Sequence, residues 1–119
     1  MNPEEVVRAH LAAQSSLDID QMSAYLADDA TFMPAIGWPT HSGLKEIRDA
    51  NEGFLKAMTK CDIEIVNLAV AGNVVLTERV DHIVFNGKQH DAAGMGAFEV
   101  VGDKITAWRD YFHIDDDEL

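Results

Sequence analysis

The sequence predicts a single α+β domain of 119 residues, in which helices come first and a curved, mostly antiparallel β-sheet comes last. Over roughly the first half of the chain, apolar residues recur at the three-to-four-residue spacing of helices. In the second half, runs of β-branched and aromatic residues alternate with short turns that contain Gly, a pattern typical of hairpins. A sheet of this kind, wrapped around the N-terminal helices, forms a cone with a pocket at its open end.

The first helix is expected to begin at Pro3 and to end near Ser16. Asn2 can cap this helix, and the side chain of Glu5 can reach back to the cap. Pro3 suits the first helical position, where no backbone N–H is needed.

A short second helix should follow, capped by Asp18 or Asp20. Its inner face is expected to contain Met22, Tyr25 and Leu26. A short strand at residues 30–33 then ends at Pro34, which has no N–H to donate to a sheet.

The third helix is expected to begin after Ser42, which can act as its cap. The stripe that predicts this helix repeats every three to four residues and consists of Leu44, Ile47, Asn51, Phe54 and Met58. We expect the sheet to curl around this third helix.

Four strands are predicted after it, at residues 62–70, 74–85, 88–101 and 104–114. The connections are Gly72-Asn73, Asn86-Gly87 and Gly102-Asp103. Asn86-Gly87 carries the strongest turn signal, because both residues tolerate the positive φ of a type I′ hairpin. Residues 115–119 form an acidic tail that we expect to be solvated.

The composition excludes several classes of partner. Asp and Glu number 21 against 9 Lys and Arg, so the formal net charge is -12. Such a surface repels phosphate backbones and anionic membranes, and we expect neither nucleic acid nor membrane as a partner. The single Cys61 and the absence of a signal-peptide pattern suit a cytoplasmic protein.

Two predicted strands place charged residues among apolar ones. Alternation along the first puts Arg79 and Asp81 on one face with Ile83, and alternation along the last puts Asp110 on one face with Trp108. Burying an ion costs several kcal/mol unless it pairs, and an Arg fork can pair with two carboxylates. These three charged side chains are therefore expected to meet inside the domain.

The same two stretches resemble a known family. The strings TERVD at residues 77–81 and GDKITAWRDYF at residues 102–112 are similar to the limonene-1,2-epoxide hydrolases. These are small cone-shaped proteins in the NTF2-like, or cystatin-like, α+β fold group, which includes SnoaL-type polyketide cyclases and ketosteroid isomerase. The similarity extends through most of the chain and implies one domain over residues 1–119.

The resemblance implies roles for three residues in a cofactor-free reaction. Asp81 would be the protonated general acid for the epoxide oxygen, and Asp110 would be the general base that activates water. Arg79 would orient both carboxylates. The resemblance also implies a homodimer, formed through the outer face of the sheet. From the spacing alone, a purely structural role for the three residues is equally open, because ion-pair networks without catalytic function also occur.

One departure from the family concerns the attacking water. The early strand of the epoxide hydrolases supplies a Tyr and an Asn that hold this water, whereas Ala30 and Phe32 occupy those places here. Two ways remain to hold a water. Thr31 could face inward after a shift of register, or another side chain, such as Asn51, Asn67 or Trp38, could substitute.

Without a held water, the acid–base pair fits a polyketide or polyether cyclase, or an isomerase like ketosteroid isomerase. A non-catalytic ligand-binding domain is the remaining alternative.

The expected substrate is a small apolar epoxide, or a bulkier polycyclic or polyketide-like molecule. We expect it to contact Phe32, Trp38, Ile83, Gly94, Trp108 and Phe112. Small residues at Ala92, Gly94 and Gly96 on one strand face predict a wide pocket, unless the glycines only allow the strand to bend. The five histidines lack ligand spacing, so no metal site is expected.

Overall fold

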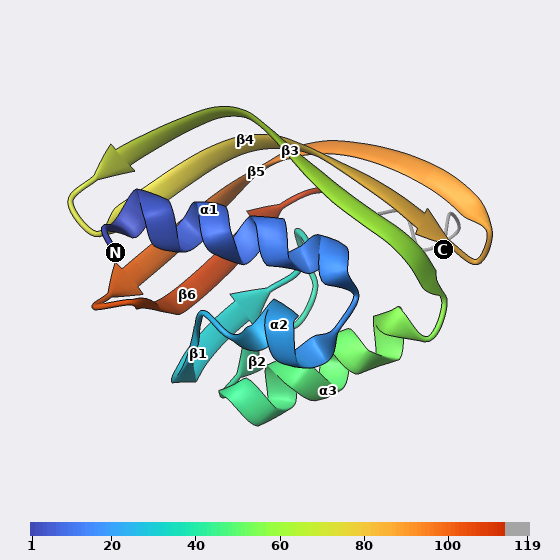
Figure 1. Cartoon of the computed structure of the whole chain (residues 1–119), viewed down its shortest axis with the longest axis horizontal. Coiled ribbons are helices and arrows are strands. Elements are labelled where there is room, and N and C mark those ends of the chain that lie inside the picture. The colour runs from blue at the N-terminus through green and yellow to red at the C-terminus, as the bar shows by residue number, and fades with distance from the viewer. Residues whose placement is uncertain (114–119) are drawn as a thin grey trace.

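The computed structural model describes residues 1–113 and confirms the α+β prediction (Figure 1). The acidic tail and Ile114, the predicted end of the last strand, lie outside the described residues. The helical elements are α1 (Pro3–Ala13), the 3-10 turn η1 (Gln14–Ser16), α2 (Ile19–Ser23) and α3 (Leu44–Leu55). The strands are β1 (Leu26–Met33), β2 (His41–Ser42), β3 (Met58–Ala71), β4 (Val74–Phe85), β5 (Lys88–Val101) and β6 (Lys104–Tyr111).

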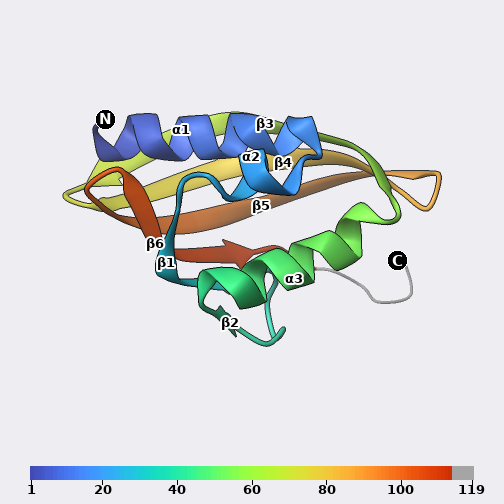
Figure 2. The same ribbon diagram turned by 60° about the horizontal axis from the view of Figure 1, so that its bottom comes forward.

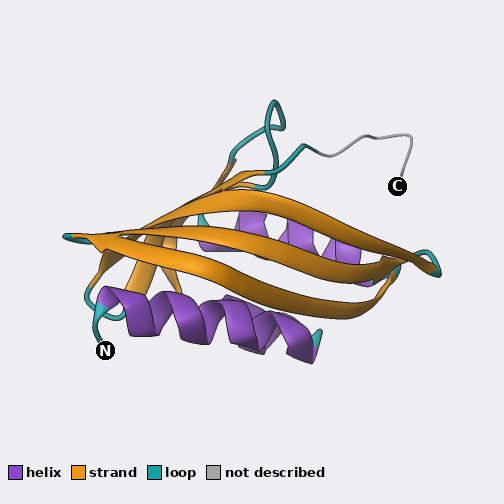
Figure 3. Cartoon of the chain, turned by 90° about the horizontal axis from the view of Figure 1, so that it is seen from above, coloured by secondary structure: helices purple, strands orange, loops and turns teal. Residues whose placement is uncertain are grey.

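The six strands form one sheet in the order β2-β1-β6-β5-β4-β3. All neighbouring pairs are antiparallel except β1 and β6, which are parallel. The long strands β3, β4 and β5 arch over α1 (Figures 1 and 3). Register shifts between β3 and β4 and between β5 and β6 accompany this curvature, as bulges increase the local bend of a strand.

The first helix begins as predicted. The Glu5 amide donates to Asn2 Oδ1 at 2.8 Å, and the Asn2 amide donates to Glu5 Oε1 at 3.0 Å, which completes a capping box. Val6, Val7 and Leu11 are buried in the main core. This apolar face therefore attaches α1 to the inside of the sheet.

The second helix is shorter than predicted. Asp18 is its cap, and the helix ends at Ser23. Leu26 was expected on its inner face but instead begins β1, where it pairs with Ile105 of β6. Strand β1 is also longer than residues 30–33, because pairing with β6 extends it toward the N-terminus.

The third helix differs from its prediction at both ends. Ser42 pairs with Thr31 in β2, and Gly43, with a φ of 92°, is the residue that precedes the helix. Met58 starts β3 instead of ending the helical stripe, and β3 accordingly begins before residue 62. Only Ile47 of the helix is fully buried.

The sheet curls around α1 rather than around α3. Helix α1 contacts β3, β4, β5 and β6, whereas α3 packs mainly on β1, β2 and α2. Figure 2 shows α3 below the sheet, beside β1 and β2, with α1 running along the long strands. The prediction that the third helix fills the cone is therefore wrong.

The hairpin turns are confirmed. Asn86 and Gly87 connect β4 to β5 with φ values of 51° and 76°. Gly72 and Gly102 take φ values of 62° and 61° in the other two turns. Each of these conformations favours Gly or Asn over residues with a branched side chain.

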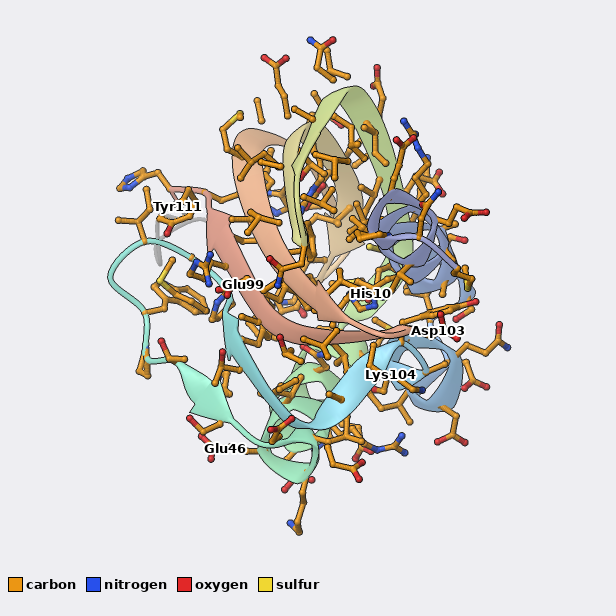
Figure 4. All side chains as sticks on the ribbon, turned by 90° about the vertical axis from the view of Figure 1, so that its left-hand side faces the viewer. His10, Glu46, Glu99, Asp103, Lys104 and Tyr111 are labelled. Carbon is orange, nitrogen blue, oxygen red and sulfur yellow. The ribbon has the colours of Figure 1, made fainter. Side chains whose placement is uncertain are left out.

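The narrow part of the cone is a packed core that includes Phe98, Trp108 and Ile105. His10 is fully buried there and points from α1 toward the sheet (Figure 4). Its ring meets Trp108 edge-on at a centroid distance of 4.6 Å. Among the described helices, each is too short or too polar to cross a lipid bilayer.

Candidate active site

The three charged residues meet as predicted, although they come from strands that are not adjacent. Arg79 and Asp81 lie on β4, Asp110 lies on β6, and β5 runs between them. On β5, Gly94 pairs with Arg79 and Gly96 pairs with Asp110. Because glycine has no side chain, the Arg79 and Asp110 side chains can meet over β5.

The Arg79 guanidinium forms paired hydrogen bonds with both carboxylates. Its Nε and Nη2 donate to Asp81 Oδ1 and Oδ2 at 3.2 and 2.9 Å. Its Nη1 and Nη2 donate to Asp110 Oδ1 and Oδ2 at 3.0 and 3.1 Å. Trp108 Nε1 also donates to Asp110 Oδ1 at 2.9 Å. The four bonds from Arg79 fix the orientation of both acids.

Burial decides the electrostatics of this cluster. The Arg79 side chain is 0% exposed, against 19% for Asp81 and 8% for Asp110. Burial raises the pKa of Asp110, although Arg79 and Trp108 stabilise its ionised form. Burial also acts to lower the pKa of Arg79, but the two carboxylates outweigh it and raise that pKa. Arg79 is therefore always charged, and Asp110 binds a proton more tightly than an ordinary carboxyl.

The two glycines of β5 are required by close contacts. A Cβ added to Gly96 would lie 2.6 Å from Arg79 Nη1 and 2.9 Å from Asp110 Oδ1. A Cβ added to Gly94 would lie 2.6 Å from the ring of Phe112. The Phe112 ring centroid lies 5.0 Å from Arg79 Cζ. Phe112 and the charged cluster fill the space beside these glycines, so the glycines do not widen the pocket. Of the two alternatives that the sequence left open, the wide pocket is therefore wrong.

The three charged residues open into a cavity of about 460 Å³. Four of the six predicted substrate contacts line it: Phe32, Ile83, Trp108 and Phe112. The other two, Gly94 and Trp38, are not among the described residues that line the cavity. Phe112 covers Gly94, and Trp38 stacks on Phe54. Most of the remaining wall is apolar and includes Met22, Leu55, Met58, Ile63 and Phe85.

The early strand offers no side chain that could hold a water. Ala30 is fully buried, and Phe32 stacks on Trp108 at a centroid distance of 4.0 Å. Phe32 lines the cavity, so alternation along the strand turns Thr31 to the other face. The predicted departure from the family pattern therefore stands.

Two of the three side chains suggested as substitutes for the water-holding pair lie elsewhere. Asn67 is bonded to Glu78 at 2.8 Å, and both residues are exposed. Trp38 stacks on Phe54 and does not line the cavity. Asn51 of α3 does line it.

Gln14 also lines the cavity, although no motif in the sequence predicted a functional role for it. Gln14 is only 4% exposed, and its side-chain amide donates to the backbone oxygens of His10 and Met22 at 2.8 and 3.1 Å. The only signal in the sequence was an amide on a helix face that is otherwise apolar.

Comparison with known proteins relates this site to one family. Residues 1–117 match the family model of the limonene-1,2-epoxide hydrolase catalytic domain. The chain is 29% identical over 115 residues to epoxide hydrolase EphG of Mycobacterium tuberculosis, which covers 92% of this chain and 72% of that protein.

Solved structures agree with this match. A structure of an M. tuberculosis LEH-like epoxide hydrolase has 28% identity and a TM-score of 0.82, covering 93% of this chain and 82% of the other. An epoxide hydrolase/cyclase-like enzyme with a role in pyran ring formation in polyether salinomycin has a TM-score of 0.84, covering 94% and 91%. Its identity of 17% shows a shared fold alone.

Proposed function

The chain belongs to the limonene-1,2-epoxide hydrolase family, and on this premise we propose that it is a cofactor-free hydrolase of the limonene-1,2-epoxide hydrolase type. It opens a neutral, apolar epoxide with water in one step to give a diol. The observation that carries the proposal is the Arg79 guanidinium, which binds two carboxylates at the inner end of an apolar cavity.

Epoxide opening at neutral pH requires an acid and a base at the same time. Two ionised carboxylates and one guanidinium carry a net charge of about -1, so the cluster favours binding a single proton. By the family resemblance, Asp81 is the general acid, which holds that proton in the reacting state and gives it to the epoxide oxygen as the ring C–O bond breaks. Asp110 accepts a proton from the water whose oxygen forms the new bond to carbon.

The electrostatics of Asp110 suit a general base once it is ionised. A carboxylate with a raised pKa is a stronger base when it is ionised, and burial raises the pKa of Asp110. After the diol leaves, one proton must move from Asp110 to Asp81 to restore the starting state. The fixed position of Arg79 between the two acids keeps both close enough for this return.

The shape and charge of the protein favour a neutral substrate. The cavity wall is mainly apolar, and a formal charge of -12 disfavours an anionic ligand. A volume of about 460 Å³ lies within the usual range for small-molecule sites and accommodates a substrate of monoterpene size or larger.

A cyclase is the second candidate, because Phe32 stands where the family holds water with an Asn. With a hydroxyl of the substrate as the nucleophile, the same acid and base would close a ring without external water. A structural neighbour with a role in pyran ring formation offers a precedent for such chemistry on this fold. A ligand-binding domain without catalysis is the least supported reading, since two carboxylates face the cavity.

We also place the protein in the cytoplasm as a homodimer. Cys61 is buried, and burial raises the pKa of its thiol to about 11, so it is a poor partner for disulfide exchange. A buried, unreactive thiol suits the reducing cytoplasm.

The test is turnover of a panel of epoxides, from limonene oxide and styrene oxide to steroid-like oxides, by the wild-type protein and by Asp110→Asn. Diol formed by the wild type alone supports hydrolysis with Asp110 as the base. A folded wild-type protein that gives no diol from any member would refute hydrolysis. Cyclic ether from a hydroxy-epoxide would then favour the cyclase.

A further inference from the structure

We propose that the side-chain oxygen of Gln14 holds the attacking water in this site, in place of the Tyr and Asn that the early strand lacks. The inference rests on the proposed hydrolase function and assigns a further catalytic residue to it. It starts from the finding that Gln14 is almost fully buried, lines the cavity, and is fixed by two hydrogen bonds.

The amide of Gln14 is locked in one orientation. Both of its bonds are donated by Nε2, one to the carbonyl of His10 and one to the carbonyl of Met22. Turning the amide by half a rotation would set its oxygen against these two carbonyl oxygens. The oxygen Oε1 therefore remains as an acceptor, and within residues 1–113 no side chain or backbone donor bonds to it.

Oε1 is not enclosed in the core. Several side-chain atoms in the described chain are fully buried and have no hydrogen-bond partner, among them atoms of His10, Ser23 and Thr77. Gln14 Oε1 also lacks a partner but is not one of these fully buried atoms, so part of its surface is accessible. Since Gln14 lines the cavity and its oxygen is not enclosed, this acceptor is open to a molecule in the cavity.

An attacking water needs two acceptors. One of its hydrogens must point to the base, which removes it, and the other must point away from the epoxide so that a lone pair faces the carbon. Among residues 1–113, Arg79 Nη2 alone donates to Asp110 Oδ2, whereas both Arg79 and Trp108 donate to Oδ1, so Oδ2 can accept from the water. Gln14 Oε1, which can only accept, suits the second hydrogen.

The packing brings α1 to the same side of the site. One turn before Gln14, the His10 ring lies 4.6 Å from the Trp108 ring, and Trp108 donates to Asp110. The other polar groups on the cavity wall are less suited. Asp91 is bonded to His82 and Gln89, and the His90 Nε2 atom is enclosed. Asn51 remains as the one competing amide.

The test compares two nucleophiles within one substrate. A hydroxy-epoxide is given to the wild type, to Gln14→Met and to Asn51→Leu, which removes the competing amide. The amount of water-opened product is then compared with the amount of cyclic ether. In Gln14→Met we expect hydrolysis to fall by about tenfold or more, because the water loses its second acceptor. Ring closure should change little, because its hydroxyl is already tethered. Asn51→Leu should keep the wild-type product ratio.

A purely structural role for Gln14 would lower both products together and leave their ratio unchanged, which would overturn the inference. A selective loss of hydrolysis in Asn51→Leu, but not in Gln14→Met, would overturn it too. If Gln14→Met does not fold, Gln14→Asn is the second variant. Its side chain keeps an amide but is shorter by one methylene group, so its oxygen no longer reaches the water. We again expect a loss of hydrolysis without a loss of ring closure. A wild type that opens no epoxide with water would refute the hydrolase function itself.

Discussion

Arg79 is the residue on which the site depends, because it neutralises two acids in a place that water hardly reaches. Its side chain has no exposed surface and forms four hydrogen bonds to Asp81 and Asp110. The rings of Phe112 and Phe98 lie 5.0 and 6.0 Å from its guanidinium carbon. A catalytic role and a structural role for this cluster predict different mutant behaviour.

Replacing Asp110 by Asn should abolish turnover without unfolding the protein. Asn keeps an oxygen that can accept from Arg79 and Trp108, but it cannot take a proton. We expect an activity loss of about 10²–10⁴-fold, the usual contribution of a general base. The melting temperature should stay within a few degrees of the wild type, as measured by circular dichroism.

The contrasting variant is Arg79→Met, which leaves the carboxylates of Asp81 and Asp110 without their cationic partner. Removing one partner of a buried ion pair typically costs about 3–5 kcal/mol. Urea denaturation should show a loss of this size. If Asp110→Asn destabilises the protein as much as Arg79→Met while activity is absent in the wild type, the cluster is structural.

The pH dependence of turnover should report the unusual state of Asp110. The base must be ionised, so kcat/KM falls as the pH drops through its pKa. Because burial raises that pKa, the acid limb should have its midpoint above 3.8, the ordinary value. The pH profile of kcat/KM, measured with limonene oxide, checks this. A midpoint at or below 3.8 would contradict Asp110 as the base.

At the scale of elements, β5 makes the site possible because it has no side chains at Gly94 and Gly96. Its Gly94 and Gly96 lie between the two strands that carry the charges, and any side chain at Gly96 would occupy the place of the Arg79–Asp110 contact. A glycine in a strand is often explained by strand bending, but here it leaves room for side chains of the two neighbouring strands to meet over β5.

Gly96→Ala should therefore separate Arg79 from Asp110. Its Cβ would come within 2.6 Å of Arg79 Nη1, closer than real contacts allow. We expect at least a tenfold loss of kcat and a destabilisation of about 1–3 kcal/mol, which is typical of overpacking. Activity and thermal melting are the measurements.

Gly53→Ala is the matched control on α3, because a Cβ there meets nothing within 4 Å. Removing an exposed glycine from a helix should stabilise the protein by about 0.5–1 kcal/mol and leave activity intact. Equal effects of the two substitutions would contradict the role given to Gly96.

Local signals in the sequence predicted some elements well and others poorly. The capping box of α1 and the Asn86-Gly87 turn depend on neighbouring residues, so both were predictable. The start of β1 at Leu26 was not, because it depends on pairing with β6, distant in sequence. The end of α3 was missed for a similar reason, since Met58 pairs with Phe85 in the sheet.

The candidate site was predictable in its charges but not in its surroundings. Strand alternation placed Arg79, Asp81 and Asp110 on inner faces, and the cost of buried charge required them to pair. The contact of Phe112 with Gly94 and the place of Gln14 on the cavity wall depend on how strands and helix pack. No periodicity in the sequence encodes such packing.

At the scale of the whole molecule, the outer face of the sheet is the surface we expect to form a homodimer. Met95 and Tyr111 pair across β5 and β6, and each is 47% exposed. Figure 4 shows Tyr111 and Glu99 on the side of these strands away from α1. Large apolar side chains exposed together are typical of an interaction surface.

Met95→Lys should weaken this association, because it would bury a charge in the dimer. We expect a shift from dimer to monomer in sedimentation at micromolar concentration, with the fold retained. A monomeric wild-type protein, or a dimer unaffected by Met95→Lys, would exclude this face as the interface.

The central claim is that water attacks the epoxide directly, with Asp81 and Asp110 acting only as acid and base. The measurement is a single turnover in heavy-oxygen water with enzyme in excess over epoxide, followed by mass analysis of the diol and of the peptides that contain the two acids. Direct attack puts the heavy oxygen in the diol and none in either carboxylate. Unlabelled diol with heavy oxygen in Asp81 or Asp110 would show a covalent ester intermediate and would contradict the claim.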